Sequence, residues 1–286
     1  MRRVLYAYLD ITNPMVAWEV AIGRLQSVGG YNQFGVSLWF YNLMNRFISS
    51  NDAQKAIYEL KLELIRQHYY PEKVSRLKGV YFFETKEMAE MALQRWGMQR
   101  HNKFITEVEF FGDNFTSVDS EWITSCLGNS ESVQDDWMHK YWSGDTMWSN
   151  PLTEVLASGF GLVHDKQLRS LAIEQVYNSW PTSSILLNAS IAGFALRNFR
   201  EICRIKPAIT MDDGIVEGKY YIDMNEFNNN QPQIIEAMKE MFADGCNLIN
   251  IIPDHGKGFT VPNLSQGFFT STDSKFVDLF RSIHEH

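Results

Sequence analysis

The sequence predicts an α+β protein. Strand-like and helix-like segments are mixed along the chain without the strict alternation that is typical of a doubly wound parallel sheet. The chain has 286 residues, of which 45% are hydrophobic, so it is long and apolar enough to bury a full core. One large domain or two moderate ones would fit this length. Possible boundaries lie near residues 178–184 and 207–214; we expect a catalytic region over 1–180 and an extension over 181–286.

The first elements follow from local signals. Val, Leu and Tyr residues predict a strand over 3–9. Asn13 is a good N-cap with proline after it, so a helix is expected to begin there and to end at the Gly29-Gly30 pair. A second helix is predicted over 52–68. The aromatic segment 34–48 has no clear period and is either a helix or a buried loop.

The middle of the chain predicts a strand, a helix and a second strand. Residues 79–83 form the first strand, and Thr85 caps a helix that Gly97 ends. Residues 104–110 alternate as a half-buried strand should, and a turn is expected at 112–114. The next segment, 115–150, is a long connection that contains four tryptophans. Such connections are usually functional or disordered, and the tryptophans argue against disorder.

The remaining elements are predicted with less distinctive signals. They are strands over 159–164, 220–222 and 248–252, and helices over 168–176, 183–200, 232–243 and 274–284.

Composition limits the kind of protein. No apolar run approaches the roughly 20 residues that a membrane span needs, and the N-terminus lacks a secretory apolar core. Three widely spaced cysteines argue against a disulfide framework, so we expect a cytoplasmic protein without a membrane partner. No metal site is predicted, because the His and Cys residues show no paired ligand spacing.

The excess of acidic residues that gives the net charge of −8 lies after residue 110. We therefore expect the first part of the chain to bind a phosphate-bearing ligand more favourably than the rest.

The candidate chemistry lies in an aromatic strand and a distant acid. The strand is Gly79-Val80-Tyr81-Phe82-Phe83, and the acid, Glu154, follows Tyr141-Trp142-Ser143-Gly144 and a proline at position 151. A flat aromatic surface and a single carboxylate are the smallest set of groups that can break a glycosidic bond to a flat leaving group. The plainer interpretation is a core strand, a solvated acid at a helix start, and tryptophans that form core or a cleft wall.

The Gly-Val-Tyr-Phe strand, followed by a short acidic helix, resembles the central motif of ADP-ribosyltransferase-fold proteins. With the opening strand and helix and the later Glu154, the resemblance covers about residues 3–165. It implies a split mixed sheet surrounded by helices, with a C-terminal α/β extension that packs on it or recognises the target. It also implies NAD as co-substrate and transfer of ADP-ribose to RNA, DNA or protein. Compact members of this kind often act as toxins in toxin–antitoxin or phage-defence systems, so an antitoxin is a possible partner.

The resemblance also implies roles for individual residues. Glu154 would be the catalytic carboxylate and Tyr81 would stack on nicotinamide, while the amide of Gly79 or of a neighbouring residue would hold the carboxamide. Phe82 and Trp142 would complete the NAD site. Many members carry a His or Arg on the first strand; here Tyr6 or Tyr8 would have to substitute, and Arg2, Arg3 or Arg24 would balance the pyrophosphate. The alternatives are an NAD hydrolase and a catalytically inactive binding module.

Overall fold

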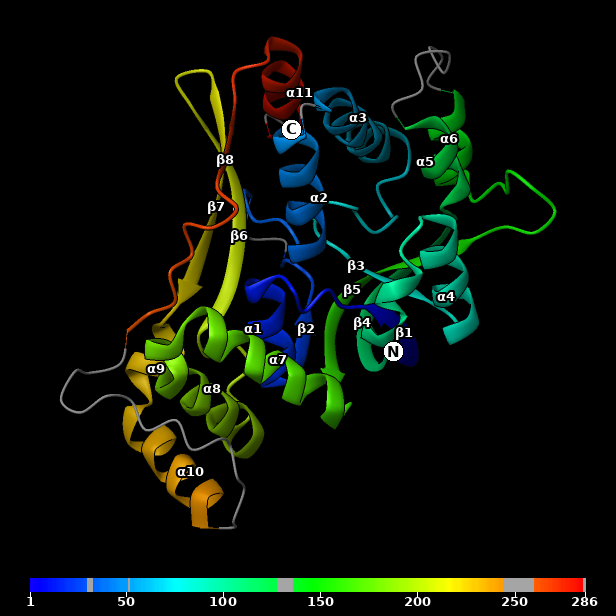
Figure 1. The fold of residues 1–286 in the computed structure, drawn as a ribbon. Coiled ribbons are helices and arrows are strands. Elements are labelled where there is room, and N and C mark those ends of the chain that lie inside the picture. Colours follow the sequence, from blue (N-terminus) through cyan, green and yellow to red (C-terminus); the bar gives the residue numbers. More distant parts are fainter. Residues whose placement is uncertain (30–32, 51, 128–135, 244–259, 285–286) are drawn as a thin grey trace.

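The computed structural model describes residues 1–29, 33–50, 52–127, 136–243 and 260–284, and its fold mixes helices and sheets, as the sequence predicts (Figure 1). The larger sheet has the strand order β2-β5-β3-β1-β4, and β5 also pairs with β4. Strands β5, β3, β1 and β4 therefore form a closed ring of pairings. The five strands are β1 (Arg2–Tyr8), β2 (Arg24–Gln26), β3 (Val80–Phe83), β4 (Ile105–Asp119) and β5 (Thr153–Val163). Every pairing between these strands is antiparallel, so the expectation of a mixed sheet is wrong.

A second antiparallel sheet has the order β6-β7-β8. Its strands are β6 (Arg204–Asp212), β7 (Ile215–Asp223) and β8 (Phe269–Ser271). The predicted strand at 220–222 is part of β7. The alternative domain boundary at 207–214 lies inside the β6–β7 hairpin. The predicted strand at 248–252 lies outside the described residues.

Helices surround the two sheets (Figure 1). The first group is α1 (Pro14–Ile22), α2 (Leu38–Ser49), α3 (Ala53–Tyr69), α4 (Lys86–Arg95), α5 (Glu121–Cys126) and α6 (Asp136–Ser143). The second group is α7 (Lys166–Ser179), α8 (Ser184–Arg197), α9 (Asn225–Asn229), α10 (Gln231–Ala243) and α11 (Ser274–His284). Short 3-10 helices span Gln99–Phe104 and Pro181–Ser183. In the described part of the chain, none of the helices combines the length and apolarity that crossing a membrane requires. The cytoplasmic location stays a prediction.

Helix caps were well predicted where the capping residue acts locally. The Asn13 side chain accepts hydrogen bonds from the N–H groups of Met15 and Val16, and Thr85 caps α4. The helix α1 nevertheless ends at Gly23, well before the predicted Gly29-Gly30 stop. Gly23 has a φ of 100° and donates its N–H to the Glu19 carbonyl, a left-handed end that glycine favours.

The connection after residue 110 is more regular than predicted. Strand β4 continues to Asp119, and the expected turn at 112–114 is a β-bulge opposite Gly159. Gly159 has a φ of 140°, and a Cβ there would lie 2.2 Å from the Phe111 carbonyl oxygen, so the two strands approach closely only because this residue is glycine. Strand β5 begins at Thr153. Glu154 therefore belongs to a central strand and is not a solvated acid at a helix start.

Residues 1–180 and 181–286 share one hydrophobic core, which contains side chains from Leu5 to Ile283. At their junction the Trp18 indole Nε1 donates to the Cys203 carbonyl at 2.8 Å, and the Tyr41 and Tyr220 rings lie 4.2 Å apart. A second cluster packs α6 and α3 on the face of the sheet that carries Tyr81 and Leu156. The separate roles assigned to the two regions stay predictions.

Candidate functional site

A buried arginine holds two carboxylates and a phenol together. The Arg76 guanidinium donates to both oxygens of Glu59, each at 2.9 Å, and its Nη1 donates to Glu154 Oε1 at 2.7 Å. The same Nη1 lies 2.7 Å from the Tyr141 hydroxyl, which in turn donates to Glu154 Oε1 at 2.8 Å. The arginine and glutamate side chains are between 0% and 7% exposed, so water screens these contacts weakly.

Three secondary-structure elements and one connecting segment supply this cluster. Glu59 lies on α3, Tyr141 on α6 and Glu154 on β5, whereas Arg76 lies in the segment between α3 and β3. That segment is fixed by its own hydrogen bonds, since the Val74 N–H donates to Thr116 Oγ1 at 2.8 Å and Ser75 Oγ donates to Glu63 at 2.9 Å. The cluster therefore joins two helices to the sheet.

The charges in the cluster perturb one another. Burial raises the pKa of the Glu154 carboxyl, while the charge of Arg76 and the Tyr141 hydrogen bond act in the opposite direction. Burial lowers the pKa of Arg76, but Glu59 first, then Tyr141, Tyr81 and Glu154, leave it well above its ordinary value. Burial also raises the pKa of the Tyr141 hydroxyl well above its ordinary value. The arginine is a permanent cation between two acids, and Tyr141 is a neutral donor.

Glu154 and Arg76 also line a large pocket. Its volume is about 820 Å³, within the range of about 300–1,000 Å³ for small-molecule sites. Glu154 Oε1 accepts the two bonds from Arg76 and Tyr141, whereas Oε2 has no hydrogen-bond partner in the part of the chain that the structure describes. One carboxylate oxygen is thus fixed by protein groups while the other stays available.

Aromatic rings form part of the pocket wall. Trp39 stacks on Tyr81 with ring centroids 5.4 Å apart, and the rings of Tyr8 and Trp39 are nearly perpendicular, with centroids 5.8 Å apart. The Tyr81 hydroxyl donates to the Arg76 carbonyl at 2.9 Å, and the Arg76 guanidinium carbon lies 5.1 Å from the Tyr81 ring centroid. Tyr81 is therefore already packed against protein groups, and the half-buried Trp39 is the better surface for a flat ligand.

Four of the seven predicted site residues line this pocket: Glu154, Tyr81, Gly79 and Tyr8. Gly79 does not offer the expected free amide, because its N–H donates to the Ser75 carbonyl at 2.8 Å. Glycine is needed there for packing instead, since a Cβ would lie 2.8 Å from Val74.

The other three predicted residues lie elsewhere. Phe82 is fully buried in the main core against Phe110, and Trp142 is fully buried in the second cluster, where its Nε1 donates to the Leu62 carbonyl at 2.9 Å. The half-buried Tyr6 donates to Glu107 at 3.4 Å and does not line the pocket. Phe82 follows the pocket residue Tyr81 on β3, where successive side chains lie on opposite faces of the sheet, so it points into the main core. Trp142 is enclosed in the second cluster, and Tyr6 lies outside the pocket lining.

The three arginines expected to face a pyrophosphate also lie outside the pocket lining. Arg2 pairs with Glu109 at 2.5 Å and Arg3 with Glu84 at 2.6 Å. Arg24 is fully buried and pairs with Glu19 at 2.5 Å. All three positive charges are already neutralised by acids.

Sequence reasoning missed Arg76, Glu59 and Trp39, and it singled out the segment that contains Tyr141 without giving that tyrosine a role. No motif marks Arg76, Glu59 or Trp39; the one signal for Glu59 is that it lies three residues after the apolar Ala56 on a predicted helix, and this spacing puts both side chains on the same helix face. The described residues contain no group of three or more His, Cys, Asp or Glu side chains placed to hold a metal ion.

The fold and the site thus define an α+β protein with a closed antiparallel sheet and an acid-bearing aromatic pocket. Residues 36–167 match the model of a family described as "Protein of unknown function (DUF2441)". The matched segment includes the whole Arg76 cluster and Trp39. No curated protein and no solved structure matches the chain.

Proposed function

We propose that the pocket binds NAD with Glu154 beside the bond between nicotinamide and ribose, and that the protein transfers ADP-ribose to a macromolecule. The observation that carries this proposal is the Glu154 carboxylate, one oxygen of which is fixed by Arg76 and Tyr141 while the other stays unpaired in an aromatic-lined pocket.

The reaction needs a group that stabilises developing positive charge. When the bond between the ribose carbon C1′ and the nicotinamide nitrogen breaks, its electron pair leaves with neutral nicotinamide and the sugar becomes oxocarbenium-like. A carboxylate that accepts a hydrogen bond from a ribose hydroxyl is strengthened as this charge builds, so it favours the transition state over the substrate. The acceptor nucleophile then bonds to C1′ and releases a proton.

Arg76 has a positioning role on this proposal. Without a cation, a carboxylate in so buried a place would favour the neutral form, because burial raises the pKa of Glu154. The Arg76 Nη1 contact at 2.7 Å opposes that effect and fixes the direction of the carboxylate. On this proposal Trp39 has the stacking role that the family resemblance implied for Tyr81.

The test is nicotinamide release from labelled NAD by the purified protein. We expect Glu154→Gln to lower the rate by at least about a hundredfold, which is the size of the effect for removing one electrostatic group. The glutamine keeps the shape and an oxygen acceptor for Arg76 and Tyr141. Glu174→Gln on the exposed surface of α7 is the matched control and is expected to leave the rate unchanged.

The outcomes separate the alternatives. Labelled ADP-ribose attached to RNA, DNA or protein in a lysate supports transfer, whereas free ADP-ribose as the product indicates an NAD hydrolase. No nicotinamide release with any acceptor, together with measurable NAD binding, favours the inactive binding module. The inactive binding module is also supported by an observation, because Glu154 Oε1 already forms a buried ion pair with Arg76. The toxin setting and the antitoxin partner stay predictions.

A further inference from the structure

One cation of the pocket wall stands apart from the others. The pocket is lined by several Lys and Arg side chains, and nearly all of them pair with a carboxylate. The paired ones are Lys55 with Asp52, Arg76 with Glu59 and Glu154, Arg95 with Glu121, Arg204 with Glu201, and Lys206 with Glu201 and Asp223. Arg46 also lines the pocket and makes no ion pair within the described ranges.

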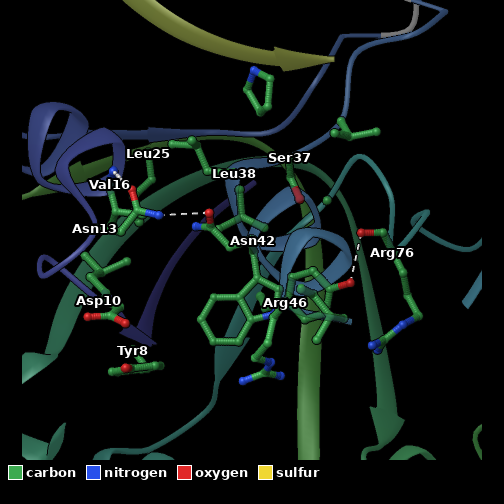
Figure 2. Close-up of a pocket in the computed structure, with 18 of the residues that line it drawn as sticks. Tyr8, Asp10, Asn13, Val16, Leu25, Ser37, Leu38, Asn42, Arg46 and Arg76 are labelled. Carbon is green, nitrogen blue, oxygen red and sulfur yellow. Dashed lines mark hydrogen bonds between the residues drawn. The ribbon is translucent and has the colours of Figure 1, made fainter. Parts of the chain in front are cut away.

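Arg46 shares a helix face with two other pocket residues. Trp39, Asn42 and Arg46 are spaced three and four residues apart on α2, so their side chains follow one another along the same face. Figure 2 shows Asn42 between Asn13 and Arg46 in the pocket. The face presents, in order, an aromatic ring, an amide and a guanidinium.

The hydrogen bonds of Asn42 fix which end of its amide is available. Asn13 Oδ1 accepts from the N–H groups of Met15 and Val16, so Asn13 Nδ2 is the group that donates to Asn42 Oδ1 at 2.9 Å. The Tyr220 hydroxyl donates to the same Asn42 oxygen at 2.8 Å. The Asn42 Nδ2 group is left as a donor with no partner among the residues that the structure places.

We infer that Arg46 and the Asn42 amide bind a phosphate group of the pocket's ligand, with Trp39 one turn earlier as the surface for an adjoining ring. An exposed guanidinium and a fixed N–H donor on one helix face match the acceptor oxygens of a phosphate. The ligand class is then a nucleotide. The inference rests on the proposed function only for the identification of the ligand with NAD.

One acid limits where the phosphate can lie. Asp10 also lines the pocket, and its carboxylate accepts from the Thr12 N–H at 3.2 Å and from the Thr12 hydroxyl at 2.6 Å. Figure 2 shows Asp10 on the side of Tyr8, away from the line between Asn42 and Arg76. A phosphate is therefore expected nearer to Arg46 than to Asp10, and the Asp10 charge opposes its binding.

The experiment compares ADP-ribose with adenosine, which lacks the phosphates, by isothermal titration calorimetry. We expect Arg46→Gln to weaken ADP-ribose binding by about tenfold or more, equivalent to about 1.4 kcal/mol, and to change adenosine binding less than about twofold. Asp10→Asn should strengthen ADP-ribose binding. Arg281→Gln, an exposed arginine on α11, is the matched control and should change neither affinity.

Several results would overturn the inference: equal ADP-ribose affinity in wild type and Arg46→Gln, equal losses for ADP-ribose and adenosine, or no ADP-ribose binding by the wild type. Because Arg46 is exposed, the variant is expected to fold, and its unfolding temperature checks this. Nicotinamide release in the same preparations separates the two proposals. ADP-ribose binding that depends on Arg46, without nicotinamide release, supports this inference and refutes the proposed reaction. Nicotinamide release by the wild type, together with an ADP-ribose affinity that Arg46→Gln leaves unchanged, supports the proposed reaction and refutes this inference.

Discussion

Replacing Arg76 by methionine tests whether the buried ion cluster stabilises the fold in the way its geometry indicates. The substitution keeps most of the apolar stem but removes the guanidinium. Glu59, which is fully buried, loses both of its 2.9 Å bonds, and Glu154 loses its 2.7 Å bond. Two carboxylates would then share a buried site without a cation.

The expected loss in the free energy of unfolding is about 3–5 kcal/mol at pH 7, the range for removing one partner of a buried ion pair. A urea titration followed by tryptophan fluorescence measures it, because Trp137 and Trp142 lie in the neighbouring cluster. The loss should shrink as the pH falls toward 5, because burial raises the pKa of the Glu154 carboxyl and its protonation removes one unpaired charge. Arg281→Met is the control, since its ion pair with Asp278 is exposed and is expected to contribute less than about 1 kcal/mol.

A second variant separates the charge effect from lost packing. Adding Glu59→Leu to Arg76→Met removes one of the unpaired carboxylates, so the double variant should regain part of the lost stability. If Arg76→Met does not fold, Arg76→Lys keeps the positive charge with a single-point donor and should show a smaller loss. A loss for Arg76→Met no larger than that of the surface control would refute the reasoning, as would a double variant less stable than the single one.

Three further predictions concern the same strands and cluster. Tyr141→Phe removes the hydroxyl that bridges Arg76 and Glu154 and should cost about 1–3 kcal/mol in a urea titration; an unchanged midpoint would show that the bridge is not stabilising. Burial raises the folded-state pKa of Glu154 above its ordinary 4.5, so its stabilising contribution is complete below pH 4.5 and is lost as the pH rises through the raised value. The stability of wild type relative to Glu154→Gln should therefore fall over that window, and a flat or rising difference would contradict the shift. Gly159→Ala should destabilise more than Gly97→Ala when both are followed by thermal unfolding, because both glycines have positive φ but only the Gly159 Cβ would collide with backbone; equal losses would count against that collision.

Much of the local structure was predictable because its causes are local. The Asn13 and Thr85 caps, the strand at 79–83 and the helix at 274–284 each depend on residues only a few positions apart. Gly23 was missed as the end of α1 because the later glycine pair gave a stronger stop signal. The residue types at 112–114 suit a turn as well as a bulge, and only the pairing with β5 distinguishes the two.

The sequence by itself determined the α+β class and singled out Tyr81 and Glu154, because strand and motif signals are carried by neighbouring residues. Only the tertiary structure placed both residues on one pocket and turned Phe82 and Trp142 away from it. It also decided the partners of Arg76, which are 17, 65 and 78 positions distant along the chain. Charged residues so far apart resemble ordinary solvated side chains in the sequence. Their burial, pairing and altered pKa values arise only when the helices close over the sheet, where low polarity strengthens every contact between them.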